Sequence, residues 1–164
     1  MTGGAGFIGS HIVERLLKEN YEVVALDNLD PYYDPKLKEI NIEIFKENPN
    51  YTFIKGDILN RELMGSIIKD IDAVFHLAAQ AGVRASIKNP EKTFEINTKG
   101  TLTLLNLCLD SNIKKFINSS SSSVYGKVKY LPFDEEHPTN PVSPYGVSKL
   151  SAEHYCKVFM RFMA

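Results

Sequence analysis

The sequence predicts an α/β fold in which a doubly wound parallel sheet is covered by helices on both faces. Two observations predict it. Short, β-branched apolar runs alternate with segments of helical periodicity along the whole of the 164-residue chain, as in consecutive right-handed βαβ units. In addition, a glycine-rich loop, "TGGAGFIG", stands directly before the first helical segment.

The first half of the chain contains two strands. Apolar residues at helical spacing in "FIGSHIVERLLKEN" predict a helix over residues 7–19. The run "YEVVALDN" predicts a buried strand over 21–28, and "YTFIKGDI" predicts a second over 51–58. A short helix is expected over 61–69. Between the two strands lies an amphipathic segment that carries Leu37, Ile40, Ile44 and Phe45.

The second half repeats the alternation. "IDAVFHLAA" predicts a strand over 71–79, and one long helix is expected over 91–110. "KKFINSSSSS" predicts a fourth strand that runs into serines, and "SPYGVSKLSAEHYCKVFMRF" predicts a last helix over 143–162. The chain contains no internal repeat or low-complexity linker, so a single domain is expected.

Composition and charge exclude several classes of protein. A hydrophobic content of 43% and a net charge of −1 suit one ordinary core and leave no basic stripe for nucleic acid. Cys108 and Cys156 lack metal-ligand spacing, so free thiols, no metal site and a cytoplasmic protein are expected. Neither a signal sequence nor a membrane span is indicated.

The glycine loop predicts a dinucleotide site. Its glycines fit G-x-G-x-x-G through Gly4, Gly6 and Gly9, or G-x-x-G-x-x-G through Gly3, Gly6 and Gly9. Either pattern places a helix N-terminus, with its unpaired N–H groups, against a pyrophosphate. Asp27 ends the next strand about twenty positions on, where a carboxylate accepts hydrogen bonds from the adenosine ribose. Because that carboxylate would repel a 2′-phosphate, NAD is preferred over NADP.

Two further strand ends belong to the same predicted site. Asp57, in "GDI", is placed to accept from the adenine amino group. The small residues of "HLAA" would let a dinucleotide approach the backbone. His76, which opens that phrase, is interpreted as a packed strand histidine that points away from the ligand.

A tyrosine and a lysine form the predicted catalytic pair. Tyr145 and Lys149 lie four residues apart on a predicted helix and therefore share one face. A phenol, with an ordinary pKa of about 10, is a poor base at neutral pH, and a neighbouring ammonium favours its ionised form. The serine run 119–123 ends the preceding strand and supplies hydroxyl groups for a substrate oxygen.

The phrases "TGGAGFIGSH", "LDNL", "GDI", "HLAAQAGVR", "SSSSSVYG" and "SPYGVSK" occur in this order along the chain. In this respect the chain resembles the extended short-chain dehydrogenases/reductases, the family of NAD-dependent sugar-nucleotide epimerases and dehydratases. The resemblance covers essentially the whole chain and implies a Rossmann-type fold.

The resemblance assigns roles residue by residue. It implies cofactor contacts from Gly3, Gly6, Phe7, Ile8, Gly9, Asp27, Asn28, Asp57, Ile58, Leu77, Ala78, Ala79, Asn97, Tyr145 and Lys149. It implies Tyr145 as the catalytic base, Lys149 as the residue that lowers the base's pKa, and Ser121 as the catalytic hydroxyl and a substrate contact.

The serine run also distinguishes reactions within the family. Related 4,6-dehydratases carry Asp and Glu directly after the catalytic hydroxyl residue, and related decarboxylases usually carry Glu before "VYG". Here Ser122 and Ser123 occupy those positions and cannot titrate at neutral pH. Epimerisation at the fourth carbon is therefore expected, with UDP-glucuronate or UDP-glucose as substrate. Arg84 is expected either to meet a uronate carboxylate or diphosphate, or to form an ordinary salt bridge.

The resemblance also bears on the extent of the chain. Family members are considerably longer, so residues 1–164 are expected to form a partial NAD-binding Rossmann domain without the first strand and the C-terminal substrate domain. The strands that end at Asp27 and Ala78 would then face a gap, leaving the domain marginally stable. Family members commonly dimerise through the two long helices, which implies a homodimer. The alternative is a non-catalytic NAD-binding fragment or interaction module, or a related dehydratase or decarboxylase.

Overall fold

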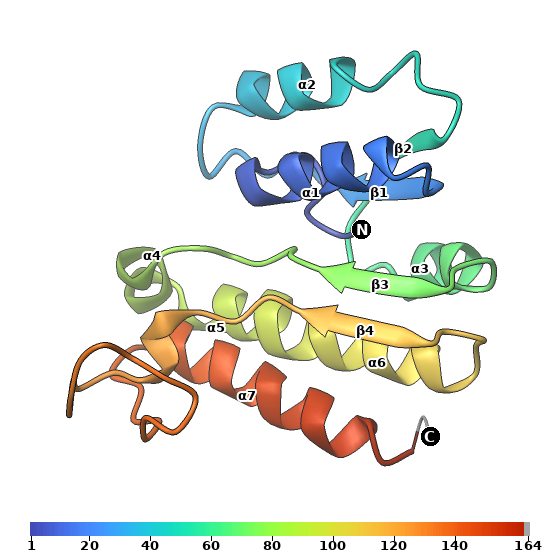
Figure 1. Ribbon diagram of the computed structural model, residues 1–164. Helices are drawn as coiled ribbons and strands as arrows, with labels where there is room; N and C mark the ends of the chain where they lie inside the picture. Colours follow the sequence, from blue (N-terminus) through green and yellow to red (C-terminus); the bar gives the residue numbers. More distant parts are fainter. Residues whose placement is uncertain (163–164) are drawn as a thin grey trace.

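The computed structural model describes residues 1–162, and it shows an α/β fold of parallel strands and packed helices (Figure 1). The strands are β1 (Val23–Asp27), β2 (Tyr51–Lys55), β3 (Ala73–His76) and β4 (Lys115–Asn118). The helices are α1 (Phe7–Lys18), α2 (Pro35–Glu43), α3 (Arg61–Ile68), α4 (Val83–Lys88), α5 (Pro90–Thr93), α6 (Thr101–Leu109) and α7 (Pro144–Phe159). The Rossmann-type class predicted from the sequence is confirmed.

The sheet consists of two parallel strand pairs joined by the first residues of the chain. Strand β1 pairs with β2, and β3 pairs with β4. Thr2 lies between the pairs and forms parallel bridges with Leu26 and His76, and Figure 1 shows the N-terminus between β1 and β3. The expected gap is therefore closed at the level of Thr2. Its N–H donates to the Phe75 carbonyl and its carbonyl accepts from the Leu77 N–H, while Met1 and Gly4 on either side of it bond to the backbone of Leu26 in β1.

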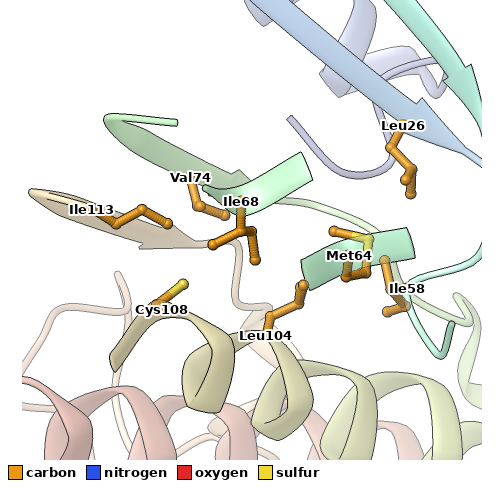
Figure 2. Packing of buried hydrophobic residues seen from close by; sticks show 8 residues of the cluster. All are labelled: Leu26, Ile58, Met64, Ile68, Val74, Leu104, Cys108 and Ile113. Atoms are coloured by element: carbon orange, nitrogen blue, oxygen red, sulfur yellow. The ribbon is translucent and has the colours of Figure 1, made fainter. Parts of the chain in front are cut away.

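The larger core cluster lies on one face of the sheet and crosses from one strand pair to the other (Figure 2). Leu26 of β1 and Val74 of β3 contribute from the sheet, while Met64 of α3 and Leu104 of α6 cover them. A second cluster on the opposite face of β1 packs Val23 and Ala25 against α1. Alternate residues of β1 thus serve different faces, as a central strand covered on both sides requires.

Helix α2 does not bury the apolar residues that make its sequence look amphipathic. Leu37, Ile40 and Ile44 are 56%, 58% and 67% exposed. The inward face instead carries Lys38, which is buried, and Asn41, whose amide donates to the carbonyl of Ala5 at 2.9 Å. Polar partners from β1 and the glycine loop hold this face of α2, and of the predicted apolar residues Phe45, just after the helix, packs against the second core cluster.

The single helix predicted over 91–110 is interrupted. After α5 the chain forms a π-helical segment, η1 (Phe94–Gly100), and then continues as α6. Asn97, within η1, is buried, and its amide donates to the Gln80 carbonyl at 3.1 Å and to Ser148 Oγ at 3.0 Å. A π-helical turn alters the angular position of a side chain along a helix. In η1 this turn places the Asn97 side chain where its buried amide finds hydrogen-bond partners. The spacing of apolar residues in the sequence does not predict such a turn.

None of the helices within residues 1–162 combines the length and the apolar character needed to cross a membrane.

Candidate active site

A cleft of about 390 Å³ lies where the strands end at their carboxyl edge, the position at which open α/β sheets bind ligands. Most of the predicted cofactor residues line it. They are Gly3, Gly6, Phe7, Ile8, Gly9, Asp27, Asn28, Asp57, Ile58, Leu77, Ala78, Ala79, Tyr145 and Lys149.

The glycine loop is packed too closely for side chains. Gly3 has φ +68°, and a Cβ atom there would lie 2.7 Å from the backbone nitrogen of Ala78. A Cβ atom on Gly9 would lie 2.2 Å from the carbonyl oxygen of Gly3. Gly6 precedes the first residue of α1 and supplies no capping side chain. The N–H groups at the start of α1 therefore remain available for an anion beside the cleft.

The close approach at Gly9 leads to a prediction. Gly9→Ala must displace the loop backbone, so we expect a loss of about 1–3 kcal/mol in the free energy of unfolding, together with weaker dinucleotide binding. Gly65→Ala is the matched control, because a Cβ atom at this helical position meets only Leu107 Cδ2 at an ordinary 3.6 Å and alanine favours helix. Chemical denaturation measures both variants. Equal stability changes would contradict the packing argument.

Asp27 is held by a buried ion pair that the sequence did not indicate. Lys38 Nζ lies 3.0 Å from Asp27 Oδ1, and the two side chains are 10% and 4% exposed. The Leu29 N–H donates to the same oxygen at 2.9 Å. Lys38 also lies 5.3 Å from the ring centroid of Tyr33. Since both contacts use Oδ1, the carboxylate is fixed in orientation and its Oδ2 is left for a ligand.

Asn28 and Asp57 meet from different strand ends. The Asn28 amide donates to Asp57 Oδ2 at 2.9 Å, and the Leu59 N–H donates to Oδ1 at 2.9 Å. The two residues thus form one polar edge of the cleft, on the side where the resemblance places the adenosine.

His76 lies behind the cleft wall. Its ring bonds to Thr2 Oγ1 at 2.7 Å and to Thr101 Oγ1 at 2.9 Å, and it is 2% exposed. Burial lowers the pKa of His76 to about 3, so the ring is neutral at physiological pH. Both ring nitrogens have protein partners, which agrees with a packed strand histidine.

The Tyr145 and Lys149 pair lies on the first turns of α7, and both residues line the cleft. Lys149 is only 5% exposed. Its burial lowers the pKa of its ammonium group, while the nearby Glu153 carboxylate acts in the opposite direction. Such burial next to a cleft is typical of functional lysines.

The serine run contributes differently from the expectation. Ser119 and Ser120 line the cleft, and Ser120 Oγ donates to the Glu153 carboxylate. Ser121 does not line it. Its Oγ instead accepts from the Ser123 N–H at 3.2 Å and caps the 3₁₀ turn η2 (Ser122–Val124). This contact uses one acceptor lone pair of the Ser121 hydroxyl, and the O–H donor takes no part in it.

Arg84 and Asn97 also lie outside the cleft lining. Arg84 is exposed on α4 and forms no ion pair with the residues that the structure describes, 1–162. Asn97 lies behind the wall, where its Oδ1 accepts from the Gln80 N–H at 2.7 Å.

Several cleft residues were not predicted from the sequence, and most of them lie in the loops that follow β1 and β3. They are Leu26, Asp30, Tyr32, Tyr33, Lys38, Gln80, Ala81 and Ile96. For Tyr32 and Tyr33 the sequence does carry a usable signal, because two adjacent tyrosines follow closely after the predicted strand end at Asp27. Lys38 had no such signal, because its pairing with Asp27 depends on how α2 docks. The described residues, 1–162, contain no cluster of His, Cys, Asp or Glu suited to a metal ion.

The residues at the cleft suit a dinucleotide. The glycine backbone leaves room for a pyrophosphate, α1 presents its N-terminus, and Asp27 presents a free carboxylate oxygen. Fold and cleft together define a Rossmann-type protein of the short-chain dehydrogenase/reductase class.

Comparison with known proteins places the chain more narrowly. The family model described as "GDP-mannose 4,6 dehydratase" matches residues 1–163, and the chain belongs to this family. A protein named putative UDP-glucose 4-epimerase from Methanocaldococcus jannaschii is 44% identical over 163 residues, covering 98% of this chain and 50% of the relative. A UDP-glucuronate 4-epimerase from Thermodesulfobacterium geofontis is 42% identical over 156 residues, covering 93% and 48%.

Solved structures agree. UDP-glucuronic acid 4-epimerase from Bacillus cereus, in complex with UDP-glucuronic acid and NAD, matches with a TM-score of 0.91 and 42% identity over 98% of this chain and 51% of that one. A double mutant of the dTDP-glucose 4,6-dehydratase DesIV from Streptomyces venezuelae, with NAD bound, matches with a TM-score of 0.88 and 33% identity, covering 98% and 50%. The chain spans about half the length of the curated relatives it matches.

Proposed function

We propose that residues 1–164 are the NAD-binding and catalytic part of a nucleotide-sugar 4-epimerase that acts on UDP-glucuronate or UDP-glucose. The observation that carries this proposal is the placement of Tyr145 and buried Lys149 in the same cleft as the glycine loop and Asp27. A protein that only bound a nucleotide would have no need of an ionisable pair at that position. The relatives named as 4-epimerases give further support.

NAD would be held along the strand ends. The glycine loop and the start of α1 would bind its pyrophosphate, Asp27 Oδ2 would accept from the adenosine ribose, and the polar edge of Asn28 and Asp57 would meet the adenine. When bound, NAD supplies a reversible hydride acceptor.

Residues of this chain would remove and return the proton of the reacting sugar hydroxyl. Tyr145 would remove it from the hydroxyl on the fourth carbon of the sugar and return it after the 4-keto sugar has turned over. The Lys149 ammonium, buried beside the cleft, would favour the ionised phenol. A hydroxyl of the serine-ended strand would bind the same sugar oxygen, with Ser121 as the resemblance implies or with Ser120, which lines the cleft.

The choice of epimerisation over dehydration rests on two side chains. Elimination of water needs an additional acid and base near the outer carbons of the sugar, and the corresponding positions hold Ser122 and Ser123. Epimerisation needs only one reversible oxidation.

A non-catalytic NAD-binding module is the second candidate, and the position of Ser121 outside the cleft lining favours it. One experiment separates the two. The full-length gene product is incubated with UDP-glucuronate or UDP-glucose, with NAD added, and the sugar products are resolved by chromatography and NMR. We expect the 4-epimer of one substrate. NAD binding without turnover of either would support the module, and the absence of NAD binding would overturn both.

We also propose a homodimer formed through the helices at 91–110 and 143–162. Its support is the exposure of apolar residues on and after α7: Val147, Val158 and Met160 are 54%, 50% and 69% exposed. Analytical ultracentrifugation of the full-length product tests this, and a monomer at micromolar concentration would contradict it.

A further inference from the structure

The backbone N–H groups in the first turn of α7 bond to acceptors from two different parts of the chain. Pro144, at the first helical position, has no N–H. Gly146 donates to the capping Ser143 Oγ at 3.1 Å, and Val147 donates to the Ser143 carbonyl at 2.9 Å. The N–H that remains in this turn belongs to Tyr145. It donates to Ser86 Oγ at 3.0 Å, a side chain 59 residues away in the sequence.

Ser86 is a fully buried hydroxyl, with 0% exposure. Its Oγ donates to the Val83 carbonyl within α4 at 2.7 Å and accepts from Tyr145, so both capacities of the hydroxyl are used. Helix α4 directly follows the cleft wall that ends at Ala81. Through Ser86, the segment that lines the cleft is bonded to the backbone of the tyrosine.

The carbonyl of Tyr145 is held as well. Ser148 Oγ donates to it at 2.8 Å and accepts from the Asn97 amide at 3.0 Å. Asn97 in turn bonds to the backbone of Gln80, next to the same wall. Tyr145 is therefore anchored at both backbone groups, and each anchor leads back to residues 80–86.

We infer that Ser86 is a positioning residue for Tyr145, acting as a cap supplied from α4 that sets the placement of the phenol relative to the cleft. The inference rests on the proposed function, since it takes Tyr145 to be the catalytic base. Its physical basis is that a small displacement of a reacting group costs a large factor in rate. Ser86→Ala removes the acceptor and leaves the half-buried Tyr145 N–H without its protein partner.

The test measures backbone anchoring and catalysis separately. In Ser86→Ala, hydrogen exchange at the Tyr145 amide is expected to accelerate at least about tenfold, while the neighbouring Gly146 amide, capped by Ser143, keeps its rate. In the full-length product, kcat is expected to fall about 10- to 100-fold, with KM for the nucleotide sugar within about twofold, because no substrate contact is removed.

Thr93→Val is the matched control. Thr93 is also 0% exposed, and within residues 1–162 its hydroxyl bonds only to the Asn89 carbonyl, at 3.1 Å. We expect it to leave kcat and the Tyr145 amide unchanged. Equal kcat in Ser86→Ala and the parent would overturn the positioning role, as would a kcat loss that is matched in Thr93→Val. If the parent protein had no epimerase activity, the proposed function would be refuted instead. Hydrogen exchange at the Tyr145 amide would still show whether Ser86 anchors the backbone of Tyr145.

Discussion

Tyr145→Phe is expected to lower kcat for nucleotide-sugar epimerisation by about 10²- to 10⁴-fold, the range that general acid–base catalysis contributes. The variant keeps the ring and loses only the hydroxyl that exchanges the proton. Because Tyr145 is fixed through its backbone bonds to Ser86 and Ser148, the helix should not move. NAD affinity should therefore change little. Steady-state kinetics and calorimetric NAD titration of the full-length product measure the two quantities.

Tyr155→Phe provides the control for this substitution. Tyr155 lies on the same helix, α7, but does not line the cleft, so the same chemical change there should leave kcat within about twofold of the parent's. If Tyr145→Phe retained full activity, the assignment of the base would be wrong. If Tyr145→Phe lost NAD binding together with activity, the lower activity would be explained by a lost contact to NAD and would not identify Tyr145 as the base.

Asp27→Asn is expected to lower the free energy of unfolding by about 3–5 kcal/mol, since it leaves the buried Lys38 ammonium without its counter-charge. NAD affinity should fall as well, because an amide is a poorer acceptor for ribose hydroxyls than a carboxylate. Urea denaturation and NAD titration report the two effects. The exposed pair Asp72 and Lys114, at 80% and 76% exposure, supplies the control Asp72→Asn, which should change neither.

The double variant Asp27→Asn with Lys38→Met separates stability from binding. Replacing both members removes the uncompensated charge, so most of the lost stability should return. NAD affinity should stay low, because the carboxylate is still missing. Recovery of NAD affinity in the double variant would mean that Asp27 serves only to neutralise Lys38 and does not contact the ribose.

The fold could be predicted from the sequence because its signals are local. Apolar runs of strand length, helical spacing and a glycine loop each lie within a short window, and all four strands appear where these runs stand. The prediction failed where the position of an element depends on a partner from another part of the chain. Leu37, Ile40 and Ile44 remain exposed because Lys38 and Asn41 turn α2 toward Asp27 and Ala5.

The candidate site was predictable to a similar degree. Residues at strand ends, such as Asp27, Asp57 and Ala78, lie in the cleft because parallel strands bring their carboxyl ends to one edge. Ser121 lies outside the cleft lining. A resemblance in sequence does not reveal which serine of the run accepts the backbone N–H of the following turn. Arg84 is exposed on the short helix α4 and does not line the cleft, so its predicted substrate contact stays a prediction.

By itself, the sequence determined the parallel α/β architecture, the glycine loop for a dinucleotide, and the Tyr145 and Lys149 pair, because periodicity and short motifs encode these within one or two elements. Only the tertiary structure decided the ion pair of Asp27 with Lys38, the π-helical turn at Asn97, and the capping of Tyr145 by Ser86. Each involves polar groups from different elements, separated by 11 residues for Asp27 and Lys38, 51 for Asn97 and Ser148, and 59 for Ser86 and Tyr145. Their partners are chosen by the need to satisfy buried polar groups once the helices have docked.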